Sequence, residues 1–226
     1  GFSQILKPQG VASFEFPHLL NMVRENQFDT AYHEHYSYLS FTTVDSIFRS
    51  QGLEIVEVSE LSTHGGSLRV VAQKKVSGKH TIAASVTAML ESEAQAGMQK
   101  MDFYQGFQAQ ALASKYAFLE FLLSAKQKGL KVGAYGAAAK GNTLLNFAGV
   151  HADLIAYVVD INPQKQGKYL PGSRLPIVAQ AYLEKNVPEF ILIFPWNLRD
   201  EICQQLKHLK AAGTQFVVAI PKLQIL

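Results

Sequence analysis

Apolar and polar residues follow two different periods along this chain of 226 residues. In the first third they alternate or cluster over short stretches, as they do in strands, and turn-forming residues separate these stretches. The strands expected from this pattern are 11–16, 53–61 and 67–73. Between the first two, Thr42 or Thr43 can cap a helix that reaches about Ser50, and Gly52 ends it.

A helical period replaces the alternation from Thr81 to Lys128, a stretch without proline. Gly97 and Gly106 interrupt it, so we expect two helices that link two domains rather than one uninterrupted rod.

Short apolar strands alternate with helices after Gly129. The expected strands are 131–135, 154–159, 190–194 and 216–219, and the expected helices are 143–148, 178–185 and 198–210. This alternation predicts an α/β domain of the doubly wound, Rossmann-like kind, with a parallel sheet covered on both faces.

Composition narrows the classes of function. Hydrophobic content of 48% supports well-buried cores, and the net charge of +3 contains no run of Lys or Arg, which argues against nucleic acid but not against a local anionic ligand. Cys203 is the only cysteine, which excludes an internal disulfide and a cysteine-based zinc site within this chain. No apolar run approaches the roughly 20 residues of a membrane span, so we expect a soluble cytoplasmic protein with no membrane partner.

Tyr32, His33, Glu34 and His35 place a phenol, a carboxylate and two imidazoles in consecutive positions. These groups suit proton abstraction beside a carbonyl, because imidazole titrates near neutrality and a phenol can stabilise a developing oxyanion. A helical turn would bring Tyr32 next to His35, whereas a strand would separate Tyr32 and Glu34 from the two imidazoles. There are two alternatives. One is a metal site formed by His33, Glu34 and His35 together with His64, and the other is a solvated polar loop.

Loops at the expected strand ends of the second domain carry further candidates. Residues 136–143 follow a strand and open a helix, where backbone N–H groups and Lys140 could bind a phosphate, although small residues there also permit tight packing. Asp160 could accept bonds from a ribose or simply form a strand-end turn. Trp196, next to Asn197, could stack on a base or anchor its loop.

His64 and Ser67 flank the glycine pair Gly65–Gly66 between two expected strands. Glycines let a backbone approach a ligand closely, while His64 and Ser67 offer hydrogen bonds. A strained hairpin is the structural alternative.

Together these motifs resemble those of the sugar C-methyltransferases, which methylate a carbon of nucleotide-linked keto-deoxysugars with S-adenosylmethionine. The resemblance covers nearly the whole chain and rests on several motifs in order: Glu15–His18, Phe28–Thr30 with Tyr32–His35, His64–Arg69, Tyr135–Asn146, Asp160–Pro163 with Lys165–Gly167, and Pro195–Leu198.

The resemblance implies a domain organisation. Members of the family have a small zinc-binding region, a class I methyltransferase domain and a C-terminal Rossmann-like domain. The chain is similar to the C-terminal two thirds: the end of the methyltransferase sheet with the catalytic loop in 1–77, linking helices in 78–128 and the Rossmann-like domain in 129–226. It contains no Gly-x-Gly. S-adenosylmethionine would therefore be held mostly by residues absent from this chain, and zinc only in the missing N-terminal region.

The resemblance also implies roles for residues. Tyr32, Glu34 and His35 match the catalytic Tyr-x-Glu-His motif, with His35 as base, Glu34 as its orienter or a sugar-hydroxyl ligand, and Tyr32 as donor to the enolate oxygen. The expected substrate-binding residues, which would contact a nucleotide-diphosphate sugar, are His33, His64, Gly65, Ser67, Lys140, Asn142, Asp160, Trp196 and Asn197.

Two other classes of function are weaker hypotheses. One is a noncatalytic nucleotide-sugar binding module that stands alone, which upstream sequence with a Gly-x-Gly loop and a cysteine cluster would argue against. A nicotinamide-dependent oxidoreductase would need the dinucleotide fingerprint, which is missing.

Overall fold

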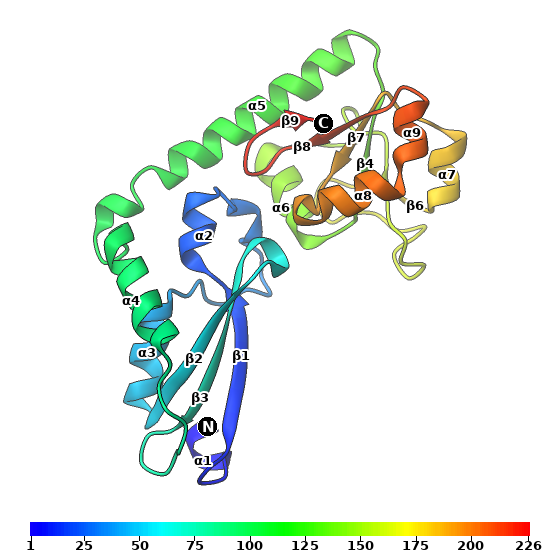
Figure 1. Ribbon diagram of the computed structural model, residues 1–226. Coiled ribbons are helices and arrows are strands. Elements are labelled where there is room, and N and C mark those ends of the chain that lie inside the picture. The colour runs from blue at the N-terminus through cyan, green and yellow to red at the C-terminus, as the bar shows by residue number, and fades with distance from the viewer. The chain divides into compact units, whose positions relative to one another are not determined.

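A computed structural model describes residues 1–226, which form two compact units (Figure 1). The first comprises Gly1–Arg24 and Tyr36–Phe107, and the second comprises Glu25–His35 and Gln108–Leu226. The segment with the predicted catalytic cluster is thus part of the second unit, although the chain on either side of it belongs to the first.

A three-stranded sheet is the centre of the first unit. Its strands are β1 (Val11–Pro17), β2 (Leu53–Leu61) and β3 (Ser67–Lys74), in the order β1-β3-β2 with antiparallel pairing on both sides of β3. The helices of this unit are α1 (Phe2–Ile5), α2 (Leu19–Arg24), α3 (Phe41–Ser50) and α4 (Ala84–Ala96), with 3-10 turns η2 (Thr63–Gly65) and η3 (Met101–Phe103).

The core of the first unit explains why these elements form. Alternate residues of β2 and β3 are buried together with residues of α3 and α4. The fully buried members include Phe41, Ile55, Leu68, Val70 and Ala72. The expected cap of α3 at Thr42 or Thr43 is wrong: Ser40 is the N-cap, because its hydroxyl accepts the Thr43 N–H at 3.0 Å.

The second unit contains a six-stranded sheet in the order β6-β5-β4-β7-β8-β9. All neighbouring strands are parallel except β8 and β9. The strands are β4 (Val132–Tyr135), β5 (Val158–Val159), β6 (Ile177–Val178), β7 (Phe190–Ile193), β8 (Gln215–Val218) and β9 (Gln224–Ile225). This confirms the predicted α/β class with a mostly parallel sheet; β6 and β9 are too short to give a sequence pattern.

The helices of the second unit after β4 alternate with its strands as the sequence predicts, while α5 precedes the first strand. They are α5 (Phe107–Gln127), α6 (Ala139–Ala148), α7 (Gln180–Lys185), α8 (Arg199–Gln205) and α9 (Lys207–Ala211), with 3-10 turns η1 (Phe28–Thr30) and η4 (Trp196–Leu198). The expected helix 198–210 is divided into η4, α8 and α9. The core joins strand residues such as Ile191 and Phe216 to helix residues such as Ile202 and Leu206.

The helical stretch predicted from Thr81 to Lys128 is divided between the two units. Gly97 ends α4 in the left-handed conformation (φ 83°), and α5 begins at Phe107. Val86 of α4 belongs to the core of the first unit, whereas Phe118 of α5 is fully buried in the second. The two helices therefore do not form a separate linking part over 78–128. None of the helices is both long and apolar enough to cross a membrane.

Candidate active site

Residues 28–35 form a compact turn in the second unit. Phe28, Asp29 and Thr30 make up η1 and are buried, and the chain then bends so that the His35 N–H donates to the Tyr32 carbonyl at 2.9 Å. The rings of Tyr32 and His35 lie 4.1 Å apart, tilted by 35°. Of the two arrangements considered, the structure has the one that makes Tyr32 and His35 neighbours.

The imidazole of His35 has a fixed orientation. Its Nδ1 lies 2.9 Å from the Thr30 carbonyl oxygen. Because a carbonyl can only accept, Nδ1 carries the proton in the neutral ring, and Nε2 keeps its lone pair for proton abstraction. The half-buried ring is thus prepared for general-base chemistry.

Glu34 and His33 are exposed. The group that orients His35 is the Thr30 carbonyl, so the orienting role considered for Glu34 is already filled. The contact with a sugar hydroxyl considered for Glu34 stays a prediction. In the structure, no group of three or more His, Cys, Asp or Glu side chains is arranged to hold a metal ion.

Asp29 is the residue that connects this turn to the Rossmann-like sheet. The indole Nε1–H of Trp196 donates to its Oδ2 at 2.8 Å, and the Nζ of Lys140 lies 4.1 Å from the centre of the same indole ring. Asp29 is only 1% exposed and Lys140 only 7%. Trp196 therefore joins a buried carboxylate through its N–H to a buried ammonium over its ring face.

Burial changes the protonation equilibria of both charged groups. It raises the pKa of Asp29 above its ordinary 3.8 and lowers the pKa of Lys140 below its ordinary 10.5, while the charge of each opposes the change in the other. The sequence predicted a phosphate contact for Lys140 and left base stacking or loop anchoring open for Trp196. In the structure the Trp196 N–H donates to Asp29, and the Lys140 ammonium lies over the indole ring, buried rather than presented to solvent.

Glycines allow tight packing at the start of the β4–α6 loop and in the first turn of α6. A Cβ on Gly136 would overlap the ring of Pro195, and one on Gly141 would overlap the ring of Phe194. This is the tight-packing alternative considered for residues 136–143. Asn142, in the first turn of α6, is half-buried, and its Oδ1 has no hydrogen-bond partner, whereas Asn197 is half-buried in η4.

Asp160 is occupied by the loops around it. Its carboxylate accepts the Ala137 N–H at 2.9 Å, the Asn162 N–H at 2.8 Å and the Lys165 ammonium at 3.2 Å. The strand-end turn considered for this residue is therefore present, and the carboxylate stabilises the β4–α6 loop.

The predicted residues of the first unit lie on the β2–β3 turn. His64 is exposed with φ 56°, and Gly65 (φ 91°) and Gly66 (φ 114°) also have positive φ. Ser67 is 1% exposed, and its hydroxyl donates to the Thr63 carbonyl at 3.2 Å. The expected ligand contact of Ser67 is thus replaced by a hydrogen bond that closes the turn.

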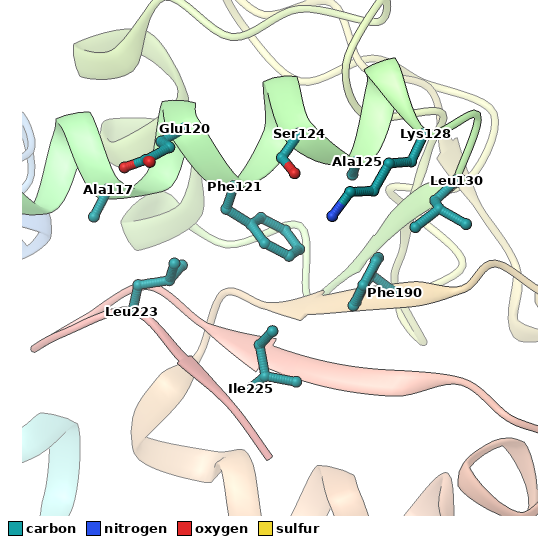
Figure 2. Close-up of a pocket in the computed structure, with 10 residues that line it drawn as sticks. All are labelled: Ala117, Glu120, Phe121, Ser124, Ala125, Lys128, Leu130, Phe190, Leu223 and Ile225. Atoms are coloured by element: carbon teal, nitrogen blue, oxygen red, sulfur yellow. The ribbon is translucent and has the colours of Figure 1, made fainter.

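A cavity of about 360 Å³ lies elsewhere in the second unit, beside α5 and the strands β7 and β9 (Figure 2). Apolar side chains such as Phe121, Phe190 and Ile225 line it, with Ser124 and Lys128 on the helix side. It contains none of the predicted site residues, so the cluster at 28–35 remains the candidate site.

Sequence reasoning missed Asp29 and Thr30. They belong to the motif Phe28–Thr30, directly before the cluster Tyr32–His35. The one available signal was that the carboxylate of Asp29 follows Phe28, an apolar residue expected in a core. The bond between Asp29 and Trp196 spans 167 positions, which no local pattern reveals.

Comparison with known proteins places the chain in a family. Residues 62–221 match the family model described as the C-methyltransferase C-terminal domain. The chain is 34% identical over all its 226 residues to the C-methyltransferase NovU of Streptomyces niveus, and it covers 54% of that protein. It thus spans about half the length of this curated relative. With the α/β fold and the matched motifs, these findings show that the chain belongs to the C-methyltransferase C-terminal domain family.

Proposed function

We propose that this chain is part of an S-adenosylmethionine-dependent C-methyltransferase that deprotonates a nucleotide-linked keto-deoxysugar next to its carbonyl and methylates that carbon. The family and the name of the relative support a methyltransferase. S-adenosylmethionine would supply an electrophilic methyl group, held mostly by residues outside this chain. The chain lacks the Gly-x-Gly expected of the loop that grips its methionine part.

The geometry of His35 is the observation that carries the mechanism. With Nδ1–H donated to Thr30, Nε2 accepts the proton from the carbon beside the keto group. The electron pair of the broken C–H bond passes into an enolate, whose oxygen accepts a hydrogen bond from the Tyr32 hydroxyl. The enolate carbon would then receive the methyl group that S-adenosylmethionine supplies, with the sulfur as leaving group. Exposed Glu34 binds a sugar hydroxyl.

The other contacts with the substrate follow from exposure and unused polar atoms. Asn142 carries a half-buried side-chain amide, whose NH₂ can donate, in the first turn of α6, and Asn197 carries another in η4, after β7. We assign these two amides to the nucleotide end of the substrate and exposed His33 to the sugar, while His64 and Gly65 stay predicted ligand residues of the first unit. Lys140, Trp196, Asp160 and Ser67 are left out because the protein itself uses their polar groups.

The three-stranded sheet would be the end of a class I methyltransferase sheet. Within the chain, β1 pairs only with β3, so its other edge has no strand beside it. Paired strands of a larger sheet would cover that edge in the complete enzyme.

The test is deuterium exchange at the substrate carbon next to the keto group, measured by NMR in deuterated water with the complete enzyme and no methyl donor. We expect exchange with the natural enzyme and with His208→Ala, a control at an exposed histidine of the same unit with no assigned role, and none with His35→Ala. Exchange that persists in His35→Ala would place the base elsewhere. No exchange in the natural enzyme, together with tight binding of the nucleotide sugar, would favour a noncatalytic binding module.

A further inference from the structure

The second unit has a crevice at the point where its strand order reverses. From β4 the chain builds β5 and β6 on one side and then returns to build β7 and β8 on the other. In doubly wound folds, ligands bind outside the carboxyl ends of the two strands that flank this point. Here these strands are β4, followed by α6, and β7, followed by η4.

The chain fills this crevice with its own residues. Asp29 lies among Lys140 and Gly141 of α6, Phe194 and Trp196 after β7, and residues after β8. The space that remains is a cavity of about 10 Å³, at the lower limit for one water molecule. The Asp29 carboxylate thus lies where such folds place the anionic part of a ligand.

We propose that Asp29 is a positioning residue for His35, and that Lys140 and Trp196 act through Asp29 rather than by touching the nucleotide. This inference rests on the proposed function only for its effect on catalysis. The structural link is short, because Asp29 is bonded to Thr30, whose carbonyl accepts the His35 Nδ1–H at 2.9 Å.

Further contacts keep the turn from shifting. The Phe28 and Phe147 rings lie 5.2 Å apart, and the Asn26 side-chain amide donates to the Ser114 hydroxyl at 2.8 Å. The Thr30 hydroxyl donates to the Gln27 carbonyl at 2.6 Å. Asp29 is the one charged side chain among the buried residues of η1. Its contacts therefore fix the position of the turn against the rest of the second unit.

Lys140 could support Asp29 or bind a phosphate of the nucleotide, and these two roles predict different kinetics in the complete enzyme. Asp29→Asn and Lys140→Met each leave one buried charge without its counterpart, which disturbs the turn. We expect kcat to fall on the order of 10- to 100-fold in each, with KM for the nucleotide sugar changed less than about 3-fold. Trp196→Phe, which keeps an aromatic ring and removes the N–H, should lower kcat in the same way.

The double variant Asp29→Asn/Lys140→Met distinguishes the two roles. It is neutral and close in shape to the natural pair, so kcat should recover above either single variant. If Lys140 instead binds phosphate, Lys140→Met raises KM 10-fold or more and Asp29→Asn gives no recovery. That result would overturn the proposal.

A second measurement does not depend on activity. In the full chain with ¹⁵N-labelled histidine, the His35 ring nitrogens should show the Nδ1–H tautomer, and Asp29→Asn or Trp196→Phe should shift the population toward Nε2–H. An unchanged His35 signal in both folded variants would refute the positioning role. Loss of the tautomer together with exchange that persists in His35→Ala would uphold the positioning and reject His35 as the base.

Discussion

His18 donates from Nε2 to Oε1 of Glu93 over 2.7 Å, which joins the end of β1 to α4 inside the first unit. The same carboxylate accepts the Phe41 N–H at 2.6 Å, the Thr42 N–H at 2.8 Å and the Thr42 hydroxyl at 2.6 Å. A side chain from α4 therefore binds the N–H groups at the start of α3 that have no partner within the helix, where a helix favours negative charge. His18 and Glu93 are each at most 1% exposed.

Replacing Glu93 by Gln should destabilise the first unit strongly. The amide cannot accept four hydrogen bonds with the strength of a carboxylate, and its NH₂ faces donors, so we expect a loss of about 2–4 kcal/mol. Urea unfolding followed by circular dichroism measures this. Glu91→Gln, at an exposed position of the same helix, is the control and should change stability by less than about 0.5 kcal/mol.

The acid sensitivity of the first unit should depend on the same residue. Burial acts to raise the pKa of Glu93, but the hydrogen bonds from His18 and Thr42 outweigh it and hold the pKa below the ordinary 4.5. A carboxyl whose pKa is depressed on folding stabilises the protein above its unfolded pKa and loses that contribution as pH falls through the folded pKa. Unfolding between pH 6 and pH 3 should show a steeper loss for the natural chain than for Glu93→Gln. Parallel curves would contradict this assignment.

Tyr32→Phe in the complete enzyme should slow methyl transfer while leaving the base in place. Loss of one donor to a developing oxyanion costs on the order of 10²- to 10³-fold in kcat. We expect slow but measurable deuterium exchange, in contrast to the complete loss expected for His35→Ala. Tyr36→Phe changes a phenol that is 95% exposed and serves as the control. Equal rates for Tyr32→Phe and the natural enzyme would remove Tyr32 from the mechanism.

Gly141→Ala should destabilise the second unit, although alanine is the better helix former by about 1 kcal/mol. The added methyl group overlaps the Phe194 ring, and overpacking of this kind costs about 1–3 kcal/mol. Thermal unfolding of the single variant gives the sign of the effect. Phe194→Leu in the same background should return part of the loss, and a stabilised Gly141→Ala would show that the α6–β7 packing is looser than described.

Asp160→Ala should lower stability by about 1–3 kcal/mol, because it leaves the buried Ala137 N–H without an acceptor. Lys165→Ala should cost less than about 1 kcal/mol, since that ammonium is partly exposed. Asp153→Ala, an exposed carboxylate in the same unit, is the matched control. If Asp160→Ala keeps full stability and raises KM for the nucleotide sugar, Asp160 binds ribose instead.

The helices and strands could be predicted because their signals are local. Alternation marked β2 and β3, the helical period marked α4 and α5, and Gly97 marked the break between them. Very short elements such as β6 were missed because two residues carry no period. The neighbouring positions of Tyr32 and His35 were also within reach of the sequence, since a turn of four residues brings them together.

The sequence by itself determined the α/β class and the chemistry available at residues 32–35. The tertiary structure decided which polar residues are left for a ligand. Lys140 and Trp196 meet Asp29 in a buried crevice, and Ser67 closes its own turn, because a polar group removed from water must find a partner and takes the nearest one the fold provides. That partner lies 167 positions away for Trp196, a distance over which residue type and spacing carry no information.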